Sequence, residues 1–204
     1  APQSITGATF TANSIVVGNE SFNIDGTLPI PSGTVHTNNL SITSNGAVNL
    51  SGGTLRFDTY NRTPGGLLTF TGGTIKVAGD RSIGTDAAIQ DFFGASPTIS
   101  TGKTLAVEGT ATLSPTSPVN LAGGTLSAPT LLLSSGSRLV TSATSLAQGA
   151  VLGLTGSVID ASGGNLTIGD GTKVNGFYHN GTLQVGQRTL TLADANDAVF
   201  DSAA

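Results

Sequence analysis

The amino-acid sequence predicts an all-β protein that folds as a parallel β-helix, a solenoid in which short strands stack coil upon coil. Three observations support this fold class: a Gly-Gly segment that occurs four times, short runs of alternating apolar residues, and a composition rich in residues that favour turns. Repeats of this kind bury a continuous core only when successive coils stack on one another. The repeat therefore carries the fold prediction, and the other two observations agree with it.

The repeated segment is ten residues long and places two glycines between two apolar–any–apolar triplets. Its four copies are VNLSGGTLRF, LTFTGGTIKV, VNLAGGTLSA and IDASGGNLTI, beginning at Val48, Leu68, Val119 and Ile159. Each triplet predicts a short strand with alternate side chains on one face. We expect the glycines to form sharp corners that β-branched residues avoid. These corner residues are Gly52, Gly53, Gly72, Gly73, Gly123, Gly124, Gly163 and Gly164.

The spacing of the triplets sets the length of one coil. Triplets begin at Leu40, Val48 and Leu55, and similar intervals return between residues 105 and 126. Three strands therefore make a coil of about 20 to 22 residues, which lies in the range of solenoid repeats. Strands this short pair poorly as isolated hairpins, so parallel stacking is favoured over a hairpin-based sandwich.

Composition excludes several classes of function. Charged residues make up 10% of the chain, the net charge is -4, and eight Lys and Arg are scattered along the sequence, which argues against nucleic acid as a partner. The absence of cysteine excludes disulfides and thiolate metal sites. No apolar run approaches the roughly 20 residues of a membrane helix. The nucleophile-elbow, phosphate-loop and dinucleotide-binding motifs are absent as well.

We expect one solenoid over residues 1–192, in which residues 1–35 form irregular first coils or a cap. Residues 78–98 interrupt the repeat and predict a lateral insert, with Thr85 capping a short helix from Asp86 to Phe93. A binding lobe is the alternative interpretation of this insert.

Residues 193–204 form an acidic tail of small residues. Neither end of the sequence contains the polar amphipathic helix that often covers the end of a solenoid. An exposed coil is an unpaired parallel edge, and head-to-tail contacts between such edges generate fibres. Either the chain is part of a longer repeat array, or its ends meet neighbouring molecules, in which case we expect self-association through the ends of the solenoid.

Asp58, Tyr60 and Arg62 are the candidate residues for a ligand groove, because they follow a Gly-Gly strand within the long link DTYNRTPGG. Polysaccharide-cleaving β-helices use clustered acids, often with Arg or Lys, on neighbouring coils. The twelve acids of this chain are thinly spread, and solvated loop charges are the competing interpretation. We therefore predict that the chain is not an enzyme, with a polysaccharide lyase or glycoside hydrolase as the alternative.

No cofactor is expected. His36 and His179 have no metal-binding spacing to another ligand, and both are expected to be surface residues. Calcium is a minor alternative because Asp170 and the acids of residues 194–201 are rich in oxygen ligands. The EF-hand order and the calcium-binding nonapeptides are missing.

The segments GGTLRF, GGTIKV and GGTLSA resemble the autotransporter-associated β-strand repeats of bacterial surface and secreted proteins, and the likeness extends loosely from Gly33 to Leu192. The resemblance implies a right-handed β-helix, export from the cell, and a passenger or stalk role in adhesion or matrix formation. It implies no catalytic residues. The sequence thus favours an extracellular structural protein, either an adhesin segment or a self-associating filament or matrix subunit, with host or matrix glycans as further partners. The alternative is a β-helix that binds or cleaves carbohydrate.

Overall fold

A computed structural model of the chain describes residues 3–9, 14–142, 144–168, 176–192 and 198–199. It is an all-β protein whose parallel sheets stack as a β-solenoid of about nine turns, with 62% of residues in strands and 4% in helix. The predicted fold class is confirmed. The single solenoid domain over residues 1–192 stays a prediction, and the chain divides into two compact units. Unit 1 comprises Ala1–Ala78 with Gly102–Thr104, and unit 2 comprises Gly79–Thr101 with Leu105–Ala204.

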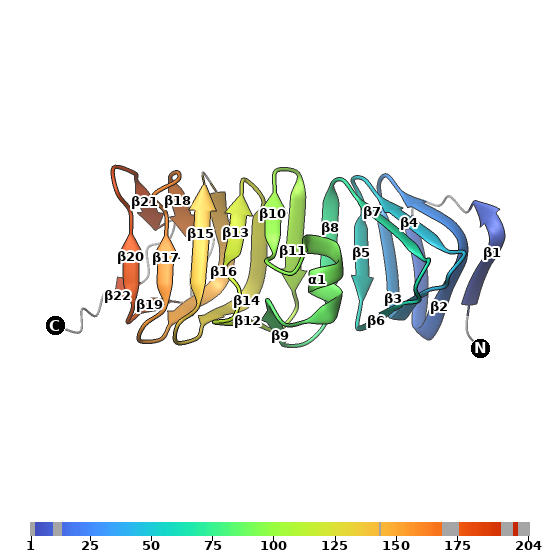
Figure 1. Cartoon of the computed structure of the whole chain (residues 1–204), viewed down its shortest axis with the longest axis horizontal. Helices are drawn as coiled ribbons and strands as arrows, with labels where there is room; N and C mark the ends of the chain where they lie inside the picture. The colour runs from blue at the N-terminus through green and yellow to red at the C-terminus, as the bar shows by residue number, and fades with distance from the viewer. Residues whose placement is uncertain (1–2, 10–13, 143, 169–175, 193–197, 200–204) are drawn as a thin grey trace. The chain divides into compact units, whose positions relative to one another are not determined.

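The strands of unit 1 follow one another with short corners between them (Figure 1). They are β1 (Gln3–Thr9), β2 (Ser14–Ile30), β3 (Thr34–Ile42), β4 (Ala47–Leu50), β5 (Thr54–Phe57), β6 (Thr59–Arg62), β7 (Leu67–Phe70) and β8 (Gly73–Val77). Their pairings are parallel, and β3, β5 and β8 stack with Thr34 beside Thr54 and Thr54 beside Thr74. The step from one of these threonines to the next is one coil. Each coil contains three strands, such as β5, β6 and β7, as predicted.

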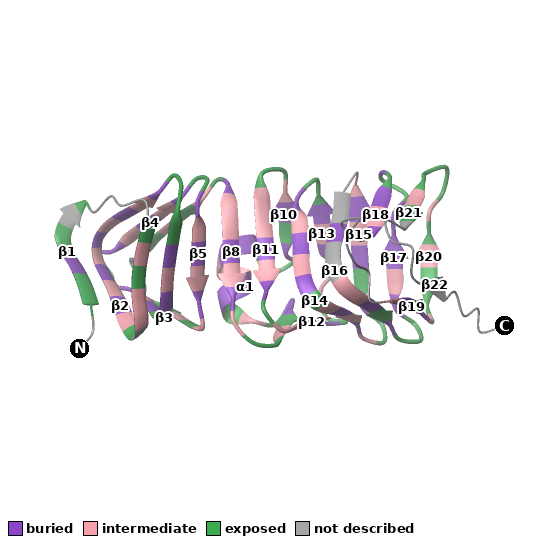
Figure 2. Ribbon diagram, turned by 180° about the vertical axis from the view of Figure 1, so that it is seen from behind, coloured by how far each residue is buried: buried purple, intermediate pink, exposed green. Residues whose placement is uncertain are grey.

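The core of unit 1 consists of columns of apolar side chains, one from each coil. Val35, Leu55 and Ile75 are aligned by strand register and are at most 2% exposed. Buried and partly exposed residues alternate along each of these strands (Figure 2), as the apolar–any–apolar triplets require. Each such side chain stabilises the fold by about 1.5–3 kcal/mol relative to its exposed state.

The first coils of unit 1 are irregular. The parallel register of β1 on β2 shifts between Thr6 and Thr9, and the register of β2 on β3 shifts at Gly18. Bulges of this type insert extra residues and bend a strand without ending its pairing. Residues 1–35 were predicted to form either irregular first coils or a cap. The described residues in this range pair as coils with an irregular register.

The described part of unit 2 contains one short helix and parallel strands from two sheets. Its elements are β9 (Arg81–Ile83), α1 (Ala87–Phe93), β10 (Thr98–Ser100), the larger part of β11 (Lys103–Val107), β12 (Thr110–Leu113), β13 (Val119–Ala122), β14 (Thr125–Leu133), β15 (Arg138–Ser142), β16 (Thr144–Gly153), β17 (Val158–Asp160), β18 (Leu166–Ile168), β19 (Phe177–His179), β20 (Thr182–Gln184), β21 (Leu190–Leu192) and β22 (Ala198–Val199). Strands β10, β13, β15, β17 and β20 form one sheet of five strands.

The coils of unit 2 are less uniform than those of unit 1. Where Thr110 lies beside Thr130, the step between coils equals that of unit 1. The step is longer where Val158 lies beside Thr182. The additional residues lie between the paired strands, because each pair keeps a continuous parallel register.

Helix α1 differs from its prediction in start and cap. It begins at Ala87, and its N-cap is Asp86, whose side chain accepts a hydrogen bond of 3.0 Å from the backbone N–H of Ile89. The prediction of Thr85 as the cap is wrong, because the carboxylate one residue later reaches the free N–H group. Ile89 and both phenylalanines of the helix are buried in unit 2.

The segment between the regular coils is also shorter than predicted. Arg81–Ile83, which lies within the expected insert at 78–98, forms β9 and pairs in parallel with β12. The irregular part of unit 2 is therefore the chain between β9 and β10. The predicted tail at 193–204 lies outside the described residues except for β22, which pairs with β19.

Candidate functional surfaces

The eight predicted corner glycines lie at the turns that lead into β5, β8, β14 and β18. Backbone φ is positive at Gly73 (100°) and Gly123 (84°), a conformation that favours glycine. The reason is different at Gly53, where a Cβ atom would lie 2.8 Å from the carbonyl oxygens of Ser32 and Gly33. At Gly124 the corresponding distance to the carbonyl oxygen of Ile99 is 2.6 Å. Glycine is therefore required at these corners for two reasons. Some corners need a positive φ, and others lie so close to the preceding coil that there is no room for a Cβ atom.

Asp58, Tyr60 and Arg62 each make a separate contact within unit 1. The Asp58 carboxylate pairs with the guanidinium of Arg56. The Tyr60 ring packs at 5.5 Å, centroid to centroid, from the ring of Phe57. Arg62 donates a hydrogen bond of 2.9 Å to the backbone carbonyl of Gly66. The interactions of these three residues thus support the fold of their own coil.

Asp160 is a carboxylate held between successive coils of unit 2. It accepts hydrogen bonds from the Ser162 hydroxyl at 2.5 Å and the Ser162 backbone N–H at 3.0 Å, and it pairs with Arg138 at 2.5 Å. The Ser162 hydrogen bonds, reinforced by Arg138, hold the pKa of Asp160 below its ordinary value. Because Arg138 starts β15 and Asp160 ends β17, the pair joins two coils that are neighbours in the five-stranded sheet.

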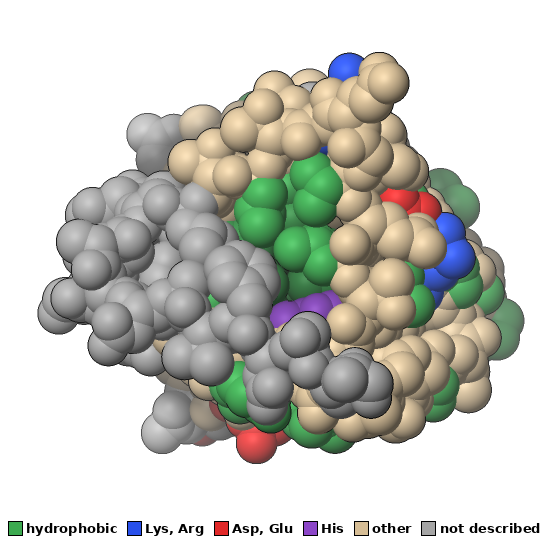
Figure 3. Space-filling view, turned by 90° about the vertical axis from the view of Figure 1, so that its left-hand side faces the viewer, with side chains coloured by type: hydrophobic (Ala, Val, Ile, Leu, Met, Phe, Trp, Pro, Cys, Tyr) green, Lys and Arg blue, Asp and Glu red, His purple; other side chains and the backbone are tan. Residues whose placement is uncertain are grey.

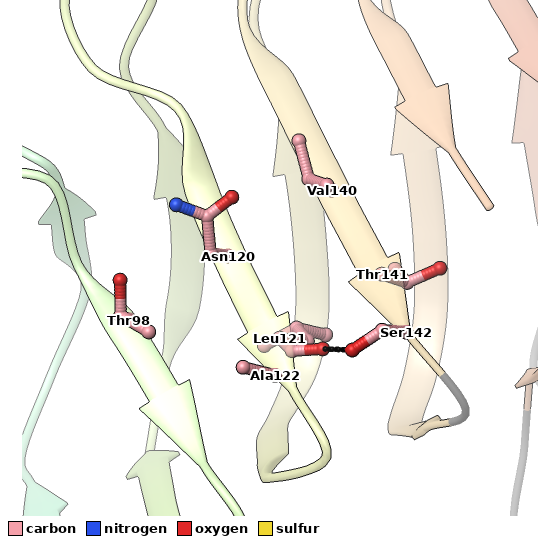
Figure 4. A pocket seen from close by; sticks show the side chains of 7 residues that line it. All are labelled: Thr98, Asn120, Leu121, Ala122, Val140, Thr141 and Ser142. Carbon is pink, nitrogen blue, oxygen red and sulfur yellow. Dashed lines mark hydrogen bonds between the residues drawn. The ribbon is translucent and has the colours of Figure 1, made fainter. Parts of the chain in front are cut away.

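A shallow hollow of about 290 Å³ opens on the five-stranded sheet of unit 2. Figure 4 shows its side chains on three adjacent strands, and Ser142 donates a hydrogen bond of 3.3 Å to the carbonyl of Leu121. The lining residues are Thr98, Asn120, Leu121, Ala122, Val140, Thr141 and Ser142. Hydroxyl and amide groups beside small apolar ones suit an uncharged ligand that makes hydrogen bonds. None of these seven side chains is titratable, so the hollow supplies no general acid or base.

His179 is buried at 5% exposure, so its prediction as a surface residue is wrong. Its ring occupies space beside Gly153, the aligned residue of the preceding coil, where a Cβ atom would collide with the imidazole. Ser157 donates its hydroxyl proton to the carbonyl of Leu154 at 2.6 Å and lies 3.3 Å from His179 Nε2. The serine therefore accepts from the imidazole, which places a proton on Nε2. Burial lowers the pKa of His179.

Ser157 is not placed as a nucleophile, because its proton points to a carbonyl and the side chain is 0% exposed. Figure 3 shows hydrophobic side chains and a histidine in a hollow at the end of unit 2 that contains β20 to β22. The imidazole stacks 6.2 Å from the ring of Phe177. This arrangement is a polar inclusion in an apolar core.

One column of basic residues runs along the outer face of unit 1. Register places His36 beside Arg56 and Arg56 beside Lys76, on strands β3, β5 and β8. We call these three residues the basic column. All three side chains are half-buried, and the inward neighbours on the same strands fill the core. Sequence reasoning missed the column, although Arg56 and Lys76 occupy equivalent positions in two copies of the repeat.

No group of three or more His, Asp or Glu residues suited to a metal ion occurs in the part of the chain that the structure describes. Asp170 and the acids of residues 194–201, on which the calcium alternative depended, lie outside that part. Among the described helices, none has the length and apolar character needed to cross a membrane.

Family models, curated proteins and solved structures were each compared with the chain, and none of the three comparisons found a match. The resemblance of the GGT segments to autotransporter-associated repeats is therefore not supported by a family model. The β-solenoid itself is shown by the structure and does not depend on that resemblance.

Proposed function

We propose that the chain is a structural β-solenoid segment of an extracellular or bacterial cell-surface protein, either of the adhesin type or a subunit of a filament or matrix. The observation that carries this proposal is the use of polar and charged side chains to join neighbouring coils, as Arg138 and Asp160 do. Solenoids stack repeats in one dimension and present extended surfaces, which suits spacing and adhesion. We assign no catalytic step and no cofactor to the chain.

Self-association along the solenoid axis is part of the proposal. In the described part of unit 2, Leu183 and Leu190 are partly exposed, whereas Ile159 and Leu166, their aligned partners in the preceding coil, are 0% exposed. Figure 3 shows hydrophobic side chains on this end of unit 2. A coil from a second copy would cover these leucines and pair with the outer strands, which is the contact that produces filaments.

Light scattering and electron microscopy over a concentration series test this proposal. We expect particle mass to rise with concentration and elongated assemblies to appear. The double variant Leu183→Asp/Leu190→Asp should prevent assembly, because two carboxylates would have to be buried. Leu152→Asp is the matched control, since Leu152 is 38% exposed on the outer side of β16. Monomers alone at high concentration, or unchanged assembly by the double variant, would overturn the filament role.

A second candidate function is carbohydrate binding, which the hollow on β10, β13 and β15 favours. Asn120 would donate a hydrogen bond to a sugar hydroxyl there, and the Ser142 hydroxyl, whose proton is donated to the Leu121 carbonyl, would accept one. A glycan array with the wild type and Asn120→Ala tests this candidate, with Gln184→Ala on the same sheet as the control. Glycan cleavage that is lost in Asp58→Ala would instead favour the enzymatic alternative over both binding and structural roles.

A further inference from the structure

We propose that the basic column of unit 1, formed by His36, Arg56 and Lys76, is a binding site for a linear acidic polysaccharide that lies along the solenoid axis. This inference goes beyond the structural role and does not depend on filament formation. The column is established by strand register on both sides of Arg56.

The basic column contains a large share of the basic residues of the chain. The chain has eight Lys and Arg and two His, and three of these ten residues lie in one column. The two units also differ in charge: unit 1 carries four Lys and Arg against three Asp and Glu, whereas unit 2 carries four against nine. An anionic ligand is therefore directed to unit 1, because like charges repel it from unit 2.

The geometry of the column favours an extended polymer over a compact anion. Neighbouring parallel strands lie about 4.8 Å apart, so the three side chains form a line of hydrogen-bond donors with one member per coil, and Arg56 and Lys76 carry the positive charge. A polysaccharide with a carboxylate on successive sugars presents charges at comparable intervals. Arg56 and Lys76 supply positive charge, and His36 adds a ring N–H as a hydrogen-bond donor.

A second column supplies hydroxyl groups beside the basic one. Thr34, Thr54 and Thr74 are aligned on the same strands, two residues before the members of the basic column, and therefore on the same face. Their hydroxyls suit the sugar hydroxyls of such a polymer. Neither column contains Phe, Tyr or Trp, so the face lacks the large stacking platforms with which proteins bind single-stranded nucleic acid.

Asp58 forms an ion pair with Arg56 and therefore competes with an anionic ligand. It also orients the guanidinium within the column. Removal of this carboxylate should strengthen binding of an acidic polymer, whereas loss of a carboxylate elsewhere in unit 1 should have a smaller effect. Glu20 is exposed on β2 and provides that comparison.

Binding of sodium polygalacturonate to the full chain, measured by biolayer interferometry, tests the inference. We expect binding that weakens with added salt, and an affinity about tenfold lower in Arg56→Gln/Lys76→Gln, since two half-buried positive charges that face the ligand are lost. The control is Arg62→Gln/Arg188→Gln, which removes the same charge outside the column and should change the affinity by no more than about twofold. Asp58→Asn should bind more tightly than the wild type, and Glu20→Gln should not.

Three results would overturn the inference: equal losses in both double variants, equal binding of neutral dextran, or tighter binding of a single-stranded oligonucleotide than of polygalacturonate. Circular dichroism of each variant separates lost binding from lost folding. A protein that binds polygalacturonate but remains monomeric would retain this inference and lose the filament role. A protein that forms filaments but does not bind polygalacturonate would retain the filament role and lose this inference.

Discussion

Unit 1 and unit 2 share one coil design but fill its interior differently. Among the described residues of unit 1, the buried polar side chain is Thr37, whose hydroxyl is hydrogen-bonded to backbone carbonyls. Unit 2 buries Ser114, Ser137, Thr141, Ser157, Asp160 and His179. Apolar columns tolerate changes of pH, whereas buried polar groups couple stability to their protonation and hydrogen bonding. We therefore expect unit 1 to respond most to lost volume and unit 2 to respond also to pH.

The largest effect is expected from Phe57→Ala in unit 1. Phe57 is 0% exposed, and its removal leaves a cavity in a column with little freedom to collapse, at a cost of about 4 kcal/mol in the free energy of unfolding. Urea unfolding followed by circular dichroism measures the loss. Hydrogen exchange should place it in β5 and in its partners β3 and β8.

Tyr178→Ala is the control for Phe57→Ala, because Tyr178 is 38% exposed in unit 2. It should cost clearly less than Phe57→Ala, since the Tyr178 side chain keeps more than a third of its surface in contact with water in the folded protein. Equal losses in the two variants would contradict the assignment of Phe57 to a packed apolar column.

A corner of unit 1 offers the next largest effect. Gly73→Ala should cost about 3 kcal/mol, because φ is positive and a Cβ atom would collide with the carbonyl oxygen of Gly53 and lie 2.9 Å from the carbonyl carbon of Gly52. Gly102→Ala shares the positive φ, at 79°, but has no atom within 4 Å of its Cβ position. It should cost only the conformational strain, about 1–2 kcal/mol. Urea midpoints that coincide for the two variants would show that close approach contributes nothing.

These corners also show which features of the fold can be predicted from the sequence. Alternating triplets identify the inward columns, because a period of two determines which side chains face the core. The repeat places Gly53 and Gly73 at equivalent corners, although their φ values differ. Which of the two needs a left-handed conformation depends on the path of the neighbouring coil, and a single sequence does not contain that information.

The surface and the polar interior were harder to predict, for physical reasons. The basic column becomes visible only when the regular register of β3 on β5 is known to persist beside the bulges of β2. Burial of His179 depends on Gly153 in the preceding coil, and the step that aligns these two residues is longer than the step of the regular repeat. Asp58, Tyr60 and Arg62 are close in sequence, but proximity along a chain does not establish a shared site.

Asp160 provides the next test of unit 2. Its pKa is lowered in the folded state, so the stability that it contributes is present above the ordinary value of 3.8 and is lost as the pH falls through the folded pKa. Asp160→Asn should cost about 2 kcal/mol at neutral pH, because the charged hydrogen bonds of the carboxylate are lost. The cost should shrink in acid, and urea unfolding between neutral and strongly acidic pH measures it. A cost that stays constant over this range would contradict the role assigned to the carboxylate.

Protonation of His179 should have the smallest effect on the free energy of unfolding. It should also make the stability of unit 2 depend on pH in a way that unit 1 does not share. Burial lowers the pKa of its imidazole, so the folded state favours the neutral form, and stability is lost as the pH falls below the ordinary value of 6.5. We expect a loss of no more than about 1.4 kcal/mol one pH unit below that value, the limit for one proton, seen as faster hydrogen exchange in β16 and β19. His179→Gln should abolish this dependence, whereas His36→Gln in unit 1 should leave it intact. If exchange in β19 were independent of pH after correction for the intrinsic rate, the polar interior of unit 2 would not be the source of its sensitivity.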